Sequence, residues 1–275
     1  MFTLNCKGNL LVIEQPIVMG IVNVTPDSFY KGNINDDIIG MVAQMINDGA
    51  TIIDVGGQST KPNSTKLTAD EEFERVIPVI EKIKTTFPNT IISIDTFYSK
   101  VAIDAVQAGA SIVNDISAGS IDKTMITEVA KLNVPYICMH MQGTPATMQQ
   151  NPSYENVTQD VLDFFIKKID ECRKAGIKDI IIDPGFGFGK TIEHNYTLLK
   201  NLATFKMLDC PILAGLSRKS VIYKTLNTTP NEALNGTTAL NTLALNNGAT
   251  ILRVHDVKEA KEAIDLFMAY KKAPL

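Results

Sequence analysis

The sequence has 275 residues, with 26 Lys and Arg against 30 Asp and Glu and a formal net charge of -4. This length is close to the roughly 250 residues typical of one eight-stranded α/β barrel, and it can enclose a large core. The nearly balanced charge, without a run of basic residues, argues against nucleic acid as a partner. The apolar runs are too short to cross a bilayer, so no membrane partner is expected.

The cysteines and the first residues predict the compartment. Cys6, Cys138, Cys172 and Cys210 are far apart and show neither C-x-x-C spacing nor a disulfide-dense pattern. The beginning of the chain also lacks the basic region, apolar stretch and cleavage site of a secretion signal. We therefore expect a cytoplasmic protein with reduced thiols.

Residues 1–16 predict a β-hairpin. Apolar and polar residues alternate from Phe2 to Cys6, Gly8 permits a turn, and the apolar run 10–13 returns. We expect this hairpin to cap one end of the domain that follows.

Beyond residue 16, short apolar runs recur at strand length. They lie at 17–22, 51–55, 90–94, 111–113, 134–139, 179–182, 211–216 and 249–254. The runs are almost continuously apolar, as expected for strands buried on both faces, and the segments between them have helical periodicity. Eight strand–helix alternations predict a single (β/α)8 TIM barrel, with residues 1–275 as one domain.

Several connecting helices have recognisable ends. Thr68 and Glu71 form the pattern of a capping box, and Pro78 is expected to kink the helix that they begin. Ser99 and Gly109 suggest the start and end of the next helix. Further helices are expected at 154–175, 231–246 and 257–270.

Polar residues follow nearly every predicted strand. In a barrel of this kind the active site lies at the carboxyl ends of the strands. The polar residues at those ends are Asn23, Thr60, Asp95, Asn114, Asp115, His140, Asp183, Ser217, Lys219, Arg253 and His255. One such residue can simply mark the passage from strand to loop, but a polar residue at every end predicts a binding site.

Asp95 and Asp183 allow three interpretations: an acid–base pair, metal ligands, or acceptors for the edge of an aminopyrimidine ring. The absence of a His and carboxylate cluster with metal-ligand spacing disfavours a dedicated metal site. A carboxylate can accept two parallel hydrogen bonds from such a ring, and Asn114 can donate and accept beside it. Arg253 and Lys219 would suit a phosphate-bearing group, or they could form structural ion pairs with Asp95 or Asp183.

The glycine-rich segment 184–191 nearly matches two nucleotide-binding motifs. The phosphate loop requires glycine where Pro184 stands, and the dinucleotide fingerprint requires glycine where Lys190 stands, so we reject both. The glycines still permit close approach of backbone to a ligand, beside the flat side chain of Phe188. His140 suits either a pocket-lining or a packing role, and His194 is expected at the surface.

Eight motifs occur in the order found in a known family. They are GIVNVTPDSF (20–29), IDVGGQST (53–60), SIDT (93–96), ND (114–115), MHMQG (139–143), DPG (183–185), SRKS (217–220) and RVH (253–255). Together they resemble the dihydropteroate synthases, which join a pterin pyrophosphate to para-aminobenzoate in folate biosynthesis. The resemblance implies a transferase that breaks the bond from the pterin methylene to pyrophosphate before the aniline nitrogen attacks.

The resemblance also implies roles for individual residues. Those implied to bind the pterin are Asp95, Asn114, Asp183 and Lys219, with Met139 and Gly215 as walls. Those implied on the pyrophosphate side are Arg253, which also stacks over the pterin, His255, and Asn23, which would help to hold Mg2+. Thr60, Ser217 and Phe188 would lie toward the leaving group and para-aminobenzoate. Lys219, Arg253 and Asp183 are the catalytic candidates, and a homodimer is expected.

Two loops depart from the family pattern. Lys31 stands where a loop carboxylate is common, and Lys61 replaces an arginine, which keeps the charge but loses the planar fork. A methyltetrahydrofolate-binding methyltransferase barrel and a non-catalytic pterin-binding protein are the alternatives. Neither requires the pyrophosphate-side set around Ser217, Arg253 and His255.

Overall fold

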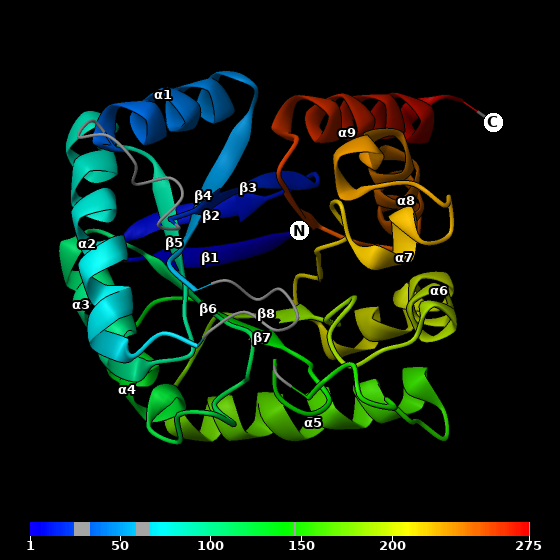
Figure 1. The fold of residues 1–275 in the computed structure, drawn as a ribbon, viewed down its shortest axis with the longest axis horizontal. Coiled ribbons are helices and arrows are strands. Elements are labelled where there is room, and N and C mark those ends of the chain that lie inside the picture. The colour runs from blue at the N-terminus through cyan, green and yellow to red at the C-terminus, as the bar shows by residue number, and fades with distance from the viewer. Residues whose placement is uncertain (25–33, 59–65, 146, 275) are drawn as a thin grey trace.

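The computed structural model describes residues 1–24, 34–58, 66–145 and 147–274, and Figure 1 shows a ring of helices around a central set of strands. The strands are β1 (Phe2–Cys6), β2 (Asn9–Ile13), β3 (Ile17–Asn23), β4 (Ala50–Gly56), β5 (Ile91–Asp95), β6 (Ile112–Asp115), β7 (Tyr136–Met139), β8 (Ile180–Asp183), β9 (Leu213–Ala214) and β10 (Ile251–Val254). The helices are α1 (Ile34–Asn47), α2 (Ala69–Thr86), α3 (Ser99–Ala108), α4 (Met125–Leu132), α5 (Val157–Ala175), α6 (Ile192–Lys200), α7 (Ser220–Tyr223), α8 (Leu234–Asn246) and α9 (Val257–Lys272). Within the described ranges, 3-10 helices span Leu202–Leu208 and Pro230–Glu232.

Strands β3 to β10 form one parallel sheet in the order β8-β7-β6-β5-β4-β3-β10-β9. A further parallel bridge between Ile182 and Ile212 joins β8 to the segment before β9, so the two ends of the sheet meet. The predicted (β/α)8 barrel is therefore confirmed. The strand expected at 211–216 is shorter in the structure, since only Leu213–Ala214 pairs with β10 as a strand.

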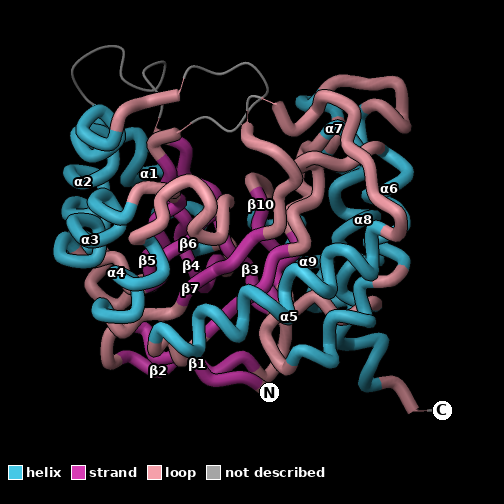
Figure 2. The backbone as a smooth tube through the Cα atoms, turned by 90° about the horizontal axis from the view of Figure 1, so that it is seen from below, coloured by secondary structure: helices cyan, strands magenta, loops and turns pink. Residues whose placement is uncertain are grey.

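The predicted hairpin is also present. Strands β1 and β2 pair in antiparallel register from Phe2 opposite Ile13 to Cys6 opposite Asn9. Leu4 and Ile13 pack in one apolar cluster with barrel residues such as Ile52, and the hairpin lies at one end of the barrel in Figure 2. This end is closed by apolar contacts, so a substrate has to enter from the other end.

Alternation along each strand separates two apolar layers. In β4, Ile53 and Val55 belong to the large cluster that includes the helices, whereas Ile52 belongs to the cluster with the hairpin. Successive side chains of a strand point to opposite faces, so Ile52 faces the barrel interior, whereas Ile53 and Val55 face the helices. Burial on both faces explains the nearly continuous apolar runs.

The observed helix ends agree with the predicted ends where a local hydrogen bond fixes them. Thr68 and Glu71 form the predicted capping box, and α2 continues through Pro78 to Thr86. Helix α5 begins later than expected because the side chain of Asn156 caps it by accepting hydrogen bonds from two backbone N–H groups. Helix α3 begins at Ser99 and is followed by Gly109, as expected, and the Ser99 backbone N–H donates to Asp122 Oδ2 at 2.8 Å.

In the segment expected to be helical from 231, the first residues form the 3-10 turn Pro230–Glu232, and α8 begins at Leu234. Helices α8 and α9 lie side by side. Among the helices in the described part of the chain, none is long and apolar enough to cross a membrane.

Candidate active site

A polar layer lies two residues beyond the apolar interior layer of the barrel. The interior layer consists of Met19, Ile52, Ile112, Ile137, Ile181, Leu213 and Ile251, in contact with the hairpin. Two residues further along the same strands or just past them come Ile21, Asp54, Asn114, Met139, Asp183, Gly215 and Arg253. Because side chains alternate along a strand, these residues face the same interior, toward the carboxyl ends of the strands. The barrel thus brings polar groups from strands that are distant in sequence into one site.

Arg253 is the centre of this layer. Its Nε donates to Asp54 Oδ2 at 2.6 Å, and its Nη2 donates to Asp95 Oδ2 at 2.5 Å. Asn114 Nδ2 also donates to Asp54 Oδ2, at 3.1 Å. The ion pair with Asp95 is one of the two pairings considered for Arg253, but the pairing with Asp54 was not expected. Its signal in the sequence is an aspartate inside an otherwise apolar strand.

The charges of the site shift the pKa values of its acids and bases. Burial, together with the carboxylates of Asp54, Asp115 and Asp183, raises the pKa of Asp95 to about 7 against the opposing effect of Arg253. Burial also raises the pKa of Asp183 and lowers the pKa of Lys219 to about 8. The site therefore holds groups that change charge close to neutral pH.

Asp115, the carboxylate next to Asn114, has a different role. It accepts hydrogen bonds from the backbone N–H groups of Ser117 and Gly119, each at 2.7 Å, and from the Tyr136 hydroxyl at 2.8 Å. Burial raises the pKa of Asp115, while these donors oppose the shift. A carboxylate with three protein donors stabilises the loop after β6 and has little capacity left for a ligand.

The loop after β8 brings Asp183, Lys219 and Phe188 together. Asp183 Oδ1 accepts from the backbone N–H of Gly185 at 2.8 Å, and Lys219 Nζ donates to the Phe186 carbonyl at 2.5 Å and lies 4.6 Å from the centre of the Phe188 ring. A side chain at Gly215 would begin 3.6 Å from Lys219 Nζ and 3.8 Å from Asp183 Oδ2, so Gly215 borders both groups. Among ion pairs of the described residues, none includes Lys219, so the structural ion pair considered for it is not present.

Lys190 anchors the same loop and was missed as a structural residue. Its side chain is buried, with Nζ 2.9 Å from His140 Nδ1, 3.0 Å from the Gly185 carbonyl and 3.1 Å from the Phe188 carbonyl. Burial lowers the pKa of Lys190 to about 7. His140 also packs edge-on against Phe164 at 4.9 Å, so of its two proposed roles the structure supports packing.

Ser217 and His255 form a pair on the opposite side of the site. The His255 backbone N–H donates to Ser217 Oγ at 3.2 Å, and the same hydroxyl lies 3.0 Å from His255 Nδ1. Burial and the neighbouring Arg253 and Arg218 lower the pKa of His255 to about 4, so the ring is neutral near pH 7. In the tautomer in which Nδ1 accepts from the serine hydroxyl, Nε2 carries the proton and can donate to an anion. Arg218 itself forms a two-point pair with Asp256, at 2.9 and 2.5 Å.

An apolar cluster borders the polar layer. It contains Met139 and Phe188, both expected as ligand walls, together with Phe97, Ile116 and Met148. These last three lie in segments that follow β5, β6 and β7, where the sequence offered no periodic pattern to mark them. Flat apolar surface beside hydrogen-bonding groups suits a heterocyclic ring.

The other residues singled out in the sequence are Asn23, Thr60, Lys31, Lys61 and His194. Asn23 is exposed at the carboxyl end of β3, and Thr60 lies outside the described residues, as do Lys31 and Lys61. His194, expected at the surface, is half-buried in a capping box with Thr191.

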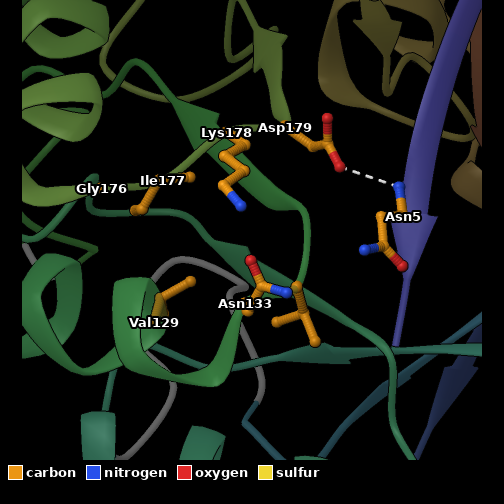
Figure 3. A pocket seen from close by; sticks show the side chains of 8 residues that line it. Asn5, Val129, Asn133, Gly176, Ile177, Lys178 and Asp179 are labelled. Atoms are coloured by element: carbon orange, nitrogen blue, oxygen red, sulfur yellow. Dashed lines mark hydrogen bonds between the residues drawn. The ribbon is translucent and has the colours of Figure 1, made fainter. Parts of the chain in front are cut away.

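A separate pocket lies at the opposite end of the barrel. Its lining includes Asn5, Asn133, Lys178 and Asp179, and Figure 3 shows the hydrogen bond from the Asn5 backbone N–H to Asp179 Oδ2, 2.8 Å long. This bond ties the hairpin to the beginning of β8. The pocket is therefore part of the closed end of the barrel and is not an extension of the polar layer.

Comparison with known proteins identifies the family. The model of the family described as pterin binding enzyme matches residues 19–255. The dihydropteroate synthase of Escherichia coli (strain K12) is 46% identical over 263 residues, which cover 94% of this chain and 93% of the relative. A crystal structure of the Yersinia pestis dihydropteroate synthase with a sulfonamide drug complex has a TM-score of 0.94 and 39% identity, covering 99% of this chain and 100% of the other.

A dihydropteroate synthase from Xanthomonas albilineans in complex with 7,8-dihydropteroate is similarly close. It has a TM-score of 0.89 and 36% identity, and the match covers 99% of this chain and 100% of that one. These similarities extend over the strands and the polar layer described above. The chain therefore belongs to the family of pterin-binding enzymes and, within it, to the dihydropteroate synthases.

Proposed function

We propose that this enzyme condenses hydroxymethyl-dihydropterin pyrophosphate with para-aminobenzoate to give dihydropteroate and pyrophosphate. The observation that carries the proposal is the meeting of Asp95, Asn114, Asp183, Lys219 and Arg253 at one end of the barrel. Acidic acceptors beside a flat apolar wall suit an aminopyrimidine ring, and cations at the rim suit its pyrophosphate. The Xanthomonas albilineans relative, which binds 7,8-dihydropteroate, supports the same assignment.

The pterin ring would bind in the part of the site that contains Asp183. Asp95 and Asp183 would accept hydrogen bonds from ring N–H and amino groups, and Asn114 would contribute its amide. Lys219 would donate to the ring from above Phe188, while Met139 and Gly215 would form the walls of the slot. Because Lys219 has a pKa of about 8, it carries a proton in most molecules at neutral pH and is suited to donate.

The pyrophosphate would lie toward Arg253 and His255. In the substitution, the bond between the pterin methylene carbon and the pyrophosphate oxygen breaks, and its electron pair leaves with pyrophosphate. The electron-rich pterin stabilises the resulting cation until the aniline nitrogen attacks and loses a proton. Arg253 and the Nε2–H of neutral His255 would stabilise the charge that develops on the leaving group. Thr60, Ser217 and Phe188 would border para-aminobenzoate.

The family implies Mg2+, and Asn23 fits a role in holding it. No group of three or more His, Cys, Asp or Glu side chains suited to a metal occurs within the described ranges. Asn23 offers one exposed amide oxygen at the carboxyl end of β3, which suits an ion bound mainly by substrate phosphates and water. When bound, Mg2+ would neutralise part of the charge on the departing pyrophosphate.

We further propose that residues 1–275 act as one catalytic domain in the cytoplasm, where the four buried cysteines remain free thiols. A homodimer would form through α8 and α9. Leu243 on α8 and Leu266 and Tyr270 on α9 are large apolar side chains that are exposed at 49%, 73% and 75%, and a second copy of the chain would cover them. In sedimentation experiments, Leu266→Glu should shift the protein toward monomer, and a wild-type protein that sediments as a monomer would exclude this assembly.

The decisive assay supplies the purified protein with hydroxymethyl-dihydropterin pyrophosphate, para-aminobenzoate and Mg2+. We expect equal amounts of pyrophosphate and dihydropteroate. Tight pterin binding without either product would instead support a non-catalytic pterin-binding protein. Replacing para-aminobenzoate by a sulfonamide tests the second pocket, since the Yersinia pestis relative binds such a drug.

A further inference from the structure

Asp54 is a buried carboxylate for which the reaction above has no use. Its side chain is completely buried, and a single oxygen, Oδ2, accepts from both Arg253 Nε and Asn114 Nδ2. The other oxygen, Oδ1, is buried without a hydrogen-bond partner among the described residues. Burying a carboxylate in this way lowers stability compared with an apolar side chain, so a contribution to fold stability alone does not explain it.

Arg253 divides its donors between two carboxylates that differ in accessibility. Asp54 is 0% exposed, whereas the Asp95 side chain is 14% and the Arg253 side chain 19% exposed. A ligand entering from the carboxyl ends of the strands can reach Asp95 and the outer nitrogens of the guanidinium, but it cannot reach Asp54. The planar guanidinium has five N–H donors in a fixed arrangement, so one edge can stay bound while another donor changes partner.

Arg253 already binds one oxygen of Asp95. Oδ2 of Asp95 already accepts from Arg253 Nη2, at 2.5 Å. A pterin that makes two parallel hydrogen bonds to Asp95 needs both carboxylate oxygens, so it competes with Arg253 for Oδ2, and an Arg253 that gives up Oδ2 needs another anion. The substrate brings one in its pyrophosphate.

Asp54 also orients the amide of Asn114. Because Asn114 Nδ2 donates to Asp54, the carbonyl oxygen of Asn114 points away from this bond and remains an acceptor. One buried oxygen therefore sets the orientation of a group on the pterin side and of a group on the pyrophosphate side.

We propose that Asp54 is a positioning residue that keeps hold of Arg253 Nε while Nη2 exchanges Asp95 for the substrate pyrophosphate, which frees Asp95 for the pterin. The inference rests on the proposed function, since it assumes that both halves of the substrate bind in this site. It makes pterin binding and pyrophosphate binding depend on each other through one guanidinium.

The result expected for a variant of Asp54 depends on the charged groups near Asp95. They are Arg253 from β10, Asp54 from β4, Asp115 from β6, Asp183 from β8, Glu72 from α2 and Lys219 from the segment after β9. In Asp54→Asn, Asp95 becomes the one carboxylate paired with Arg253 and loses a neighbouring negative charge. Both changes favour the ionised form of Asp95 and strengthen the pair with which the pterin competes.

The experiment measures the binding of hydroxymethyl-dihydropterin pyrophosphate, without para-aminobenzoate, from pH 5 to 9 for the wild type and for Asp54→Asn. We expect the variant to bind at least about tenfold more weakly at pH 8. In a plot of affinity against pH, the acidic limb is the change in affinity at low pH, and it should lie about one pH unit lower in the variant. Ser93→Ala is the matched control, because Ser93 is buried, lies opposite Asp54 in the β4–β5 register, and has a hydroxyl without a hydrogen-bond partner among the described residues. It should leave both the affinity and the limb unchanged.

An Asp54→Asn protein that binds like the wild type, or more weakly with an unmoved limb, overturns the proposal. A second measurement needs no Asp54 variant. In the wild type, the Arg253 Nε–H signal in ¹⁵N NMR should stay protected from solvent exchange when the pterin pyrophosphate binds, while the Nη signals shift. Loss of Nε–H protection overturns the proposal as well. If the wild type forms no dihydropteroate, the proposed function fails, independently of the Asp54 result.

Discussion

Lys190 and His140 form a buried donor–acceptor pair, with Lys190 Nζ 2.9 Å from His140 Nδ1. The same amino group donates to two carbonyls of the loop after β8, at 3.0 and 3.1 Å, and has a longer contact of 3.4 Å with the His140 carbonyl, so the three shortest of its four contacts match the three N–H donors of an ammonium. A neutral amine has two donors and cannot satisfy all three. The pair therefore joins the loop that carries Phe188 to the end of β7.

Replacing Lys190 by methionine should loosen this loop. The carbonyls of Gly185 and Phe188 and the ring nitrogen of His140 would lose their donor, so we expect the free energy of unfolding to fall by about 2 kcal/mol, with weaker pterin binding. Urea unfolding and a binding titration with 7,8-dihydropteroate measure the two effects. The control is Lys200→Met on the exposed end of α6, which should stay within about 0.5 kcal/mol of the wild type. Equal stability of the Lys190 and Lys200 variants would contradict the anchoring role.

The neutral state of His140 predicts a pH dependence. Burial and Lys190 lower its pKa to about 2 from an ordinary 6.5, so between these values the unfolded chain binds a proton that the folded chain does not. Stability from this residue is present above pH 6.5 and is lost as the pH falls. Asp95 and Glu72, with pKa values raised by burial to about 7 and about 8, act in the opposite direction, because the folded state keeps their protons.

A variant separates these contributions. His140→Asn offers an oxygen near the position of Nδ1 but does not titrate. Between about pH 6 and 4, the wild type should lose about 1.4 kcal/mol per pH unit relative to the variant. Parallel unfolding curves for the two proteins across this range would show that His140 is not held neutral.

Two glycines with similar backbone angles should respond differently to alanine. Gly185 and Gly8 have φ values of 69° and 91°. A Cβ at Gly185 would overlap the His140 carbonyl oxygen, whereas a Cβ at Gly8 would meet nothing within 4 Å. Thermal and urea unfolding should give a loss of about 1 kcal/mol for Gly8→Ala from backbone strain, and at least about 3 kcal/mol for Gly185→Ala from strain plus steric overlap. A similar loss at both positions would mean that the loop can move away from β7.

Asp183→Asn should impair pterin binding more than Thr60→Ala does. The loss of charge-assisted hydrogen bonds of about 1.5 to 3 kcal/mol corresponds to an affinity reduced by roughly 10- to 100-fold. Asp179→Asn is the control at the opposite end of the same strand, where the carboxylate binds the hairpin, and it should change stability without changing the pterin KM. A larger effect of Thr60→Ala on the pterin KM would reverse the assignment of the two pockets.

Much of the fold can be predicted from the sequence, because the signals for it are local. Nearly continuous apolar runs of strand length mark the barrel strands, and the hydrogen bonds of the Thr68–Glu71 capping box join residues three positions apart. The rule that barrel active sites lie at strand ends then led to Asp95, Asp183 and Arg253. Resemblance to the dihydropteroate synthases supplied their expected roles.

How these groups pair could not be predicted from the sequence, because each pair joins distant segments. Asp54 and Arg253 are separated by 199 positions, and Lys190 and His140 by 50, so no local pattern indicates either contact. In the sequence, Asp54 interrupts an apolar strand, and Lys190 stands in a segment that nearly matches a nucleotide-binding motif. Their partners come within hydrogen-bond distance only when the barrel closes. Buried polar groups require such partners because leaving them unpaired costs more free energy than a fold can readily offset, and the partner is chosen by the packing of distant strands.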